Sequence, residues 1–111
     1  MKTVIQKKNK SKISKLAPIV LFVYNRVDHL KKTIISLKRN KLSKKSDLII
    51  FSNNSKNKND EKKVFEVRKY IHKLKGFKKI KIYQRKKNLG FSKNIISGVS
   101  YVLKKYQKLI V

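Results

Sequence analysis

One apolar stretch limits the folds that are open to this chain. Residues 16–26 read LAPIVLFVYNR, an apolar run that ends abruptly in Tyr24, Asn25 and Arg26. The run is far shorter than the roughly 20 residues that a helix needs to cross a bilayer. Continuous apolar runs of this length are typical of strands that are buried on both faces of a parallel sheet. We therefore expect a central strand that carries polar side chains to the carboxyl edge of an α/β sheet.

An amphipathic helix is predicted directly after this strand, and two more follow downstream. Asn25 is a candidate N-cap for the first helix, with Asp28 as its capping-box partner. The second helix is expected to open with Asp60 and Glu61 and to close at Gly76. The predicted inward faces are Val27, Leu30, Ile34 and Leu37 for the first helix, Val64, Val67, Ile71 and Leu74 for the second, and Phe91, Ile95, Val99, Val102 and Tyr106 for the third, in which Gly98 permits close packing.

Three further segments have strand patterns. Residues 47–51 are a second apolar run, residues 79–84 alternate as an edge strand with one exposed face would, and residues 108–111 begin another apolar run. Strands and helices alternate, with connections long enough for right-handed parallel crossovers. The predicted fold is a three-layer α/β/α arrangement around a mostly parallel sheet of about four strands, a Rossmann-like half that we expect to be truncated.

The charge of the chain is extreme, because 32 Lys and Arg residues face 5 Asp and Glu residues and leave a net charge of +27. Such a charge attracts polyanions, including nucleic acid, acidic membrane and nucleotide phosphates. The lysines are spread over every segment and accompany many Asn and Ile residues, so a biased genomic base composition explains them as well. The absence of cysteine excludes disulfides, thiolate metal sites and cysteine nucleophiles.

Residues 1–15 are expected to be a disordered basic leader in front of a domain that spans residues 16–111, because the leader has few apolar groups. A secretory signal is the alternative, since basic residues precede an apolar run. Pro18 lies early in that run, and Tyr24 to Arg26 stand where a small-residue cleavage site would be. We therefore expect a cytoplasmic protein.

Catalytic and metal-binding motifs are scarce. Neither GxGxxG nor GxxxxGK[ST] occurs, so dinucleotide-binding and P-loop functions lose their main support. His29 and His72 lie on predicted helices without a partner at helical spacing, which favours solvated or packed side chains. Asp60 and Glu61 offer oxygen ligands to magnesium, although their place in a first helical turn has a structural explanation. The residues themselves identify no catalytic group and no metal ligand.

Three loops are expected at the carboxyl edge of the sheet, where α/β proteins bind ligands. Tyr24 and Asn25 would stack on and hydrogen-bond a base, and Arg26 would meet a phosphate; the alternative is that they cap the core and the helix. Asn88 and Gly90 precede a helix, where amides bind phosphate, or they form a plain turn. Taken together, the loops favour a nucleotide site.

The segments PIVLFVYNR, DLIIFSNNS and KKNLGFSKNI resemble the N-terminal half of family 2 and related glycosyltransferases of the GT-A fold, over about residues 16–111. The resemblance implies transfer of a sugar from an NDP-sugar, often UDP-linked, to a glycan or lipid-linked acceptor in polysaccharide biosynthesis. It also implies a divalent cation (Mg²⁺ or Mn²⁺) and a place at the cytoplasmic face of a membrane, with peripheral contact to anionic lipid. No specific nucleic-acid partner is expected.

The resemblance also assigns roles to individual residues. Tyr24 would lie against the base, with Asn25 and Arg26 beside it. Asn53 stands where the family usually has an aspartate, and a neutral acceptor there is expected to weaken donor binding by about 1 kcal/mol. The ribose and phosphates would lie near Asn88, Gly90 and Lys93.

In such enzymes the fourth strand runs into an acidic DxD-type motif that holds the metal, and the catalytic base lies further on, whereas this sequence ends at Val111. We therefore expect the chain to be a fragment that is inactive by itself. Two other hypotheses stay open: a small basic α/β module that binds nucleic acid or anionic membrane, and a truncated product without function. The sequence leaves the donor sugar and the acceptor open.

Overall fold

The computed structural model describes residues 4–6, 17–106 and 108–110. The elements run in the order β1 (Val4–Gln6), β2 (Ile19–Val23), α1 (Val27–Lys38), the 3-10 turn η1 (Ser43–Lys45), β3 (Asp47–Ser52), α2 (Lys58–Ile71), β4 (Lys79–Gln84), α3 (Phe91–Tyr106) and β5 (Lys108–Ile110). The strands form one sheet in the order β1-β5-β2-β3-β4. All neighbours are parallel except β1, which pairs antiparallel with β5. The predicted mostly parallel sheet is confirmed.

Strand β1 was not predicted, because it lies inside the segment that was expected to be a disordered leader. Its residues pair with β5 in the register Val4↔Ile110, so residues 4–6 depart from the expected disorder. An exposed edge of a sheet offers a row of unpaired backbone groups, which can recruit a short strand such as Val4-Ile5-Gln6. The remainder of the predicted leader, residues 1–3 and 7–15, lies outside the described residues.

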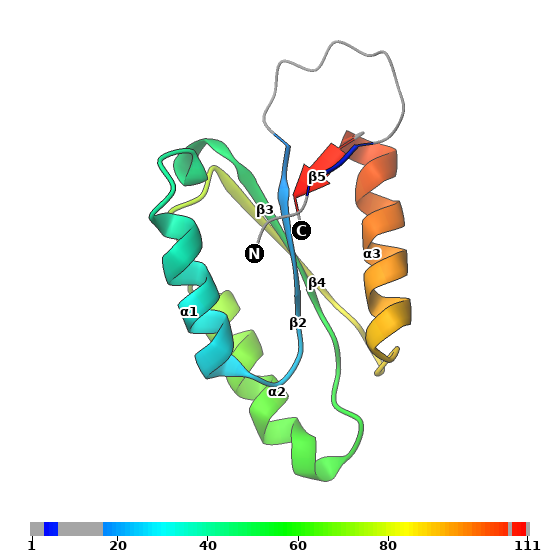
Figure 1. Cartoon of the computed structure of the whole chain (residues 1–111). Helices are drawn as coiled ribbons and strands as arrows, with labels where there is room; N and C mark the ends of the chain where they lie inside the picture. The colour runs from blue at the N-terminus through cyan, green and yellow to red at the C-terminus, as the bar shows by residue number, and fades with distance from the viewer. Residues whose placement is uncertain (1–3, 7–16, 107, 111) are drawn as a thin grey trace.

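Helices cover both faces of the sheet, as the three-layer prediction requires (Figure 1). Helices α1 and α2 pack on one face, where Ile34 and Val67 meet Leu48 and Ile50 of β3. Helix α3 packs on the other face, where Val102 meets Val20, Ile49 and Phe51. Because side chains alternate along β2 and β3, each of these two apolar strands contributes residues to both cores.

The start of α1 differs from the prediction. Arg26, not Asn25, is the N-cap residue, and no side chain caps the helix. The amide of Asn25 instead donates to Oδ1 of Asp60 over 2.6 Å. A hydrogen bond to a carboxylate is stronger than one to a neutral backbone group, so Asn25 ties the end of β2 to the first turn of α2.

The buried stripe of α3 also differs from the prediction. Phe91 is 80% exposed, because it is the first residue of the helix at the edge of the sheet. The buried residues are Asn94, Gly98 and Val102. A Cβ at Gly98 would lie 2.5 Å from Cε1 of Phe22, so the predicted close packing at Gly98 is confirmed.

Two smaller predictions are wrong. Helix α2 ends at Ile71, and Gly76 lies further on, with a φ of 101°, in the connection to β4. Strand β4 is at the edge of the sheet, but α3 covers its second face. There Tyr83 stacks on Phe51 with ring centroids 5.1 Å apart, and Nζ of Lys81 donates to the hydroxyl of Tyr106 over 3.3 Å.

Candidate functional site

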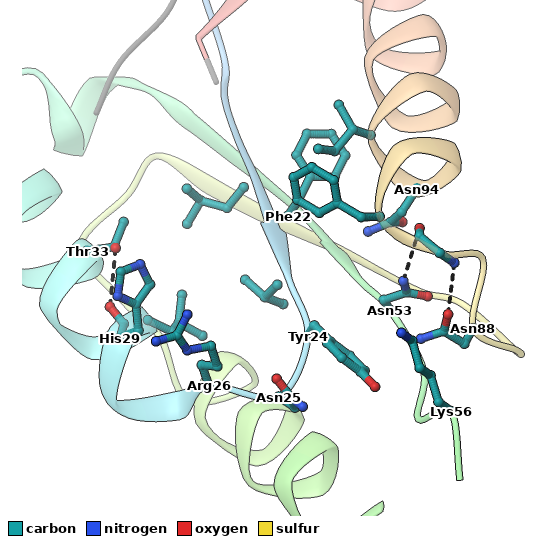
Figure 2. Close-up of a pocket in the computed structure, with 16 residues that line it drawn as sticks. Phe22, Tyr24, Asn25, Arg26, His29, Thr33, Asn53, Lys56, Asn88 and Asn94 are labelled. Atoms are coloured by element: carbon teal, nitrogen blue, oxygen red, sulfur yellow. Dashed lines mark hydrogen bonds between the residues drawn. The ribbon is translucent and has the colours of Figure 1, made fainter. Parts of the chain in front are cut away.

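A cavity of about 550 Å³ lies between α1 and α3 at the carboxyl end of β2 (Figure 2). Its two ends differ in chemistry. The apolar end follows β2 and is lined by Leu21, Phe22, Leu30 and Ile95. The polar end lies where the three loops meet and is lined by Tyr24, Asn25, Arg26, Asn53, Lys56 and Asn88.

The structure brings together six of the seven residues that sequence reasoning placed at a nucleotide site. Tyr24, Asn25, Arg26, Asn53, Asn88 and Gly90 all line the cavity. The exception is Lys93, whose exposed side chain is not among the lining residues. In Figure 2, Arg26 and His29 lie on the α1 side of the space, and Asn53 and Asn88 lie on the other side.

Asn53 clamps two loops together. It is 5% exposed. Its Oδ1 accepts from the backbone N–H of Asn54 over 3.0 Å and from that of Leu89 over 3.1 Å, and its Nδ2 donates to the carbonyl of Gly90 over 3.5 Å. A carbonyl oxygen has two lone pairs, so both are already used. If Asn53 were to accept a bond from a base, it would have to share one of these acceptor positions.

Asn88 completes the clamp from the other loop. Its Nδ2 donates to the carbonyl of Asn54 over 2.7 Å, and its Oδ1 accepts from the backbone N–H of Gly90 over 2.8 Å. Asn54 returns a bond from its own amide to the carbonyl of Lys86 over 2.8 Å. Gly90 has a φ of 79°, in the left-handed region that favours glycine. The loop geometry therefore depends on Asn-to-backbone bonds that join residues far apart in sequence.

The start of α3 still offers backbone donors. The first bond of the helix runs from the N–H of Asn94 to the carbonyl of Gly90 over 3.2 Å. The N–H groups of the preceding helical residues, Phe91 to Lys93, have no acceptor within the helix. Lys93 can thus contribute a backbone amide even though its side chain lies away from the cavity.

Arg68 of α2 supports the carboxyl ends of β3 and β4 from beneath. Its guanidinium donates to the Oγ of Ser52 over 3.0 Å, to the carbonyls of Ser52 and Asn53 over 3.3 Å each, and to the carbonyl of Arg85 over 3.0 Å. Burial lowers the pKa of Arg68, but an arginine starts so high that it stays protonated. Sequence reasoning missed Arg68, although arginine in a lysine-rich chain suggests a need for its forked geometry.

Arg85 continues this support toward the cavity. Its guanidinium lies over the Phe51 ring, 5.0 Å from the ring centre. It donates to Oδ1 of Asn94 over 2.9 Å and to Oγ of Ser97 over 2.8 Å. Burial lowers its pKa as well. Arg85 thereby joins the end of β4 to the first turns of α3, whose Asn94 lines the cavity.

The two histidines have different surroundings. His29 lines the cavity, and its backbone carbonyl accepts a bond from the Thr33 hydroxyl over 3.2 Å. His72 lies at the end of α2, where Nε2 is 2.7 Å from Oε1 of Gln84. Lys56 also lines the cavity, and the predicted set of site residues did not include it. Its position in the loop after β3 was the available signal.

Asp60 is an acid that contacts the loops around the cavity, and both of its carboxylate oxygens already accept hydrogen bonds. Besides the bond from Asn25, its Oδ2 accepts from the backbone N–H of Lys56 over 3.3 Å. Within the described part of the chain, no three His, Asp or Glu residues are grouped so that they could hold a metal ion. These residues therefore do not fit the divalent cation that the resemblance implies.

Comparison with known proteins places this architecture in a family. A family model described as glycosyl transferase family 2 matches residues 19–107. The chain belongs to glycosyl transferase family 2. The predicted resemblance to the N-terminal half of these glycosyltransferases and the predicted α/β half of a GT-A fold are thereby confirmed. Enzymes of the family use a nucleotide-sugar donor and an acceptor, and generally a divalent cation.

No curated protein and no solved structure matches the chain. In the residues that the structure describes, every helix is too short or too polar to cross a membrane.

Proposed function

We propose that the polar end of the cavity binds the nucleotide part of an NDP-sugar, with UDP as the favoured carrier. The chain would then be the donor-binding half of a glycosyltransferase that acts on a glycan or lipid-linked acceptor in polysaccharide biosynthesis. The observation that carries the proposal is the convergence of three loops on one cavity, at the carboxyl edge where α/β sheets bind ligands.

Tyr24 is our candidate for the base. It follows β2, is half-buried and lines the cavity. A partly exposed aromatic ring can stack on any base, which provides affinity with little base selectivity. Asn25 is tied to Asp60 through its amide, which leaves its carbonyl oxygen as the group it would present to the ligand.

The diphosphate is assigned to the basic groups that surround the polar end of the cavity. Arg26 and Lys56 line the cavity from the loops that follow β2 and β3. The amides of residues 91–93 add the positive end of the α3 dipole, which favours phosphate. In this arrangement Asn53 and Asn88 hold the loops in place, and the N–H groups and basic side chains contact the phosphates.

We expect binding without sugar transfer. Transfer needs a group that accepts the proton of the acceptor hydroxyl. Asp60, the acid in the loop contacts, is held by Asn25 and by the N–H of Lys56. The described residues that line the cavity include no carboxylate.

We place the protein at the cytoplasmic face of an anionic membrane, to which its lysines would be attracted.

Calorimetric titration tests the proposal. UDP, GDP, ADP and inorganic pyrophosphate would each be titrated at about 0.15 M salt, where exposed charges more than roughly 8 Å apart are largely screened. We expect UDP to bind more tightly than pyrophosphate, and Tyr24→Ala to remove the difference. Tyr101→Ala is the matched control and should keep it, because Tyr101 lies beside Tyr83 of β4 and is not among the residues that line the cavity.

Equal affinity for UDP and pyrophosphate in the unchanged chain would contradict the proposal, because it would reduce binding to charge attraction. Duplex DNA and acidic vesicles would be titrated in parallel. Binding of either at low salt that exceeds that of UDP and falls steeply as the salt concentration rises would favour the basic-module hypothesis instead.

A further inference from the structure

Asn94, in the first turn of α3, carries a buried amide of which only one end is hydrogen-bonded. The residue lines the cavity and is 4% exposed. Its Oδ1 accepts from Nε of Arg85 over 2.9 Å. Within the part of the chain that the structure describes, Nδ2 makes no hydrogen bond. Buried polar groups are almost always paired, so the N–H donors of this amide indicate a partner that the described residues do not supply.

Arg85 fixes which end of the Asn94 amide faces the cavity. If the amide were turned over, Nδ2 would meet the guanidinium, donor against donor. The guanidinium is itself held, because it lies 5.0 Å from the centre of the Phe51 ring and donates to Oγ of Ser97 over 2.8 Å. Nitrogen and oxygen lie on opposite sides of a planar amide, so Nδ2 points away from Arg85 and from β4. The cavity therefore receives a donor at this position.

The side chain of Asn94 projects toward β2. One turn further along α3, a Cβ at Gly98 would lie 2.5 Å from Phe22 of β2, which shows how closely the helix approaches this strand. Side chains two residues apart in a strand share a face, and in Figure 2 Phe22, Tyr24 and Asn94 lie on the same side of β2. The donor of Asn94 thus faces the space beside Tyr24, the ring that we assign to the base.

The surroundings of Nδ2 favour a neutral acceptor over a phosphate. The basic side chains that line the cavity, Arg26 and Lys56, come from the loops after β2 and β3 and are exposed. The free N–H groups at the start of α3 point along the helix axis, whereas Asn94 projects sideways. Burial of a charged group is costly, so the phosphates should stay with the exposed cations and the helix amides. A buried amide beside an aromatic ring suits a carbonyl group at the edge of a flat base.

We propose that Asn94 selects the base, by donating from Nδ2 to the carbonyl oxygen at position 4 of uracil, and that Arg85 is the positioning residue for this amide. Position 4 is the part of the pyrimidine farthest from the ribose, which fits a buried donor when the ribose and diphosphate stay with the exposed groups. Cytosine has an amino group at position 4 and would place donor against donor, so the site should prefer UDP to CDP. The inference rests on the proposed function, because it requires a nucleotide whose base lies beside Tyr24.

Calorimetric titration with UDP, CDP and pyrophosphate tests the proposal. We expect UDP to bind about tenfold more tightly than CDP, as one well-formed hydrogen bond allows. Asn94→Asp keeps the size of the side chain and an acceptor for Arg85, but presents an oxygen to the base. The preference should then invert, because the oxygen repels the uracil carbonyl and accepts from the cytosine amino group. Asn40→Asp adds the same charge at an exposed residue just after α1 and should keep the preference for UDP.

The side-chain N–H signals of Asn94, followed by NMR, give a second readout in the unchanged chain, so the test does not depend on how well Asn94→Asp folds. UDP should shift these signals more than CDP or pyrophosphate does. Equal affinity for UDP and CDP, an unchanged preference in Asn94→Asp, or equal shifts of these signals with UDP and pyrophosphate would each overturn the role of Asn94, even where UDP binds more tightly than pyrophosphate. Equal affinity for UDP and pyrophosphate would instead contradict the proposed function, and this inference with it.

Discussion

Strands β2 and β3 are neighbours with similar apolar sequences, IVLFV and DLIIFS, yet they are buried to different extents. Every residue of β3 after Asp47 is buried, whereas Leu21 and Phe22 in the centre of β2 are not. Pairing explains the difference, because β3 has strands on both edges and β2 has one along most of its length. An apolar run therefore predicts an interior strand, but how far its side chains are buried depends on whether strands pair with both of its edges.

The largest expected effect contrasts the two strands directly. Ile50→Ala in β3 removes a side chain that is 0% exposed, and we expect it to lower the free energy of unfolding by about 3–4 kcal/mol. Leu21→Ala in β2 should cost about 1–2 kcal/mol, because part of that side chain is already solvated. Urea denaturation measures both. Equal losses of unfolding free energy in the two variants would contradict the difference in burial between β2 and β3.

The carboxyl ends of the two strands offer a second contrast. Arg68 donates three bonds to the end of β3 and one to the residue after β4, and Arg68→Met would leave the carbonyls of Ser52, Asn53 and Arg85 without that donor. We expect a loss of about 2–3 kcal/mol in unfolding free energy. Asn25→Ala, which removes one bond at the end of β2, should cost about 1 kcal/mol. Arg39→Met, at an exposed residue, is the control and should change little.

Gly98 tests whether the open edge lets β2 move. Gly98→Ala brings a methyl group to 2.5 Å from Phe22 of β2 and to 3.0 Å from Phe51 of β3. Overpacking costs about 1–3 kcal/mol. Because β2 has one free edge, we expect Phe22 to shift and the loss to stay near 1 kcal/mol. A change in the chemical shifts of Phe51 that exceeds that of Phe22 would contradict this expectation.

The smallest effect concerns the other edge strand, β4. The hydrogen bond with Tyr101 and burial raise the pKa of Tyr83 to about 12, and the same bond, together with Lys105, lowers the pKa of Tyr101. A raised tyrosine pKa means that the folded state favours the neutral phenol, so this stabilising contribution is lost as the pH rises from about 10 to about 12. Tyr101→Phe should move the Tyr83 titration, followed by phenolate absorbance, back toward lower pH. An unchanged titration would show that α3 does not cover this face of β4.

Much of this fold could be predicted because it depends on local patterns. The apolar runs at β2 and β3 and the helical spacing in α1 and α2 are visible in the sequence. Strand β1 was missed because three residues in a basic segment gain their order from the edge of β5. Phe91 was misplaced because helical spacing gives a face of the helix but not where the helix extends past the sheet.

The site was predicted as a place more successfully than as a set of contacts. Loop positions at strand ends indicated Tyr24, Asn25 and Asn88. The engagement of Asn53 with Leu89 and of Asn25 with Asp60 depends on loops that meet only in the folded chain. Arg68 and Arg85 were missed for the same reason, since their acceptors are backbone carbonyls and the neutral side chains of Ser52, Asn94 and Ser97, which have no sequence signature.

The most direct test of the central claim is an NMR titration of the isotopically labelled chain with UDP at about 0.15 M salt, with pyrophosphate as the matched ligand. The claim predicts that UDP shifts the amides of Tyr24, Asn25 and residues 91–93, and that pyrophosphate shifts residues 91–93 but not Tyr24. The amide signal of Lys78, just before the amino end of β4, should stay unchanged with UDP and with pyrophosphate. Shifts spread over the surface lysines, with none at Tyr24, would contradict it.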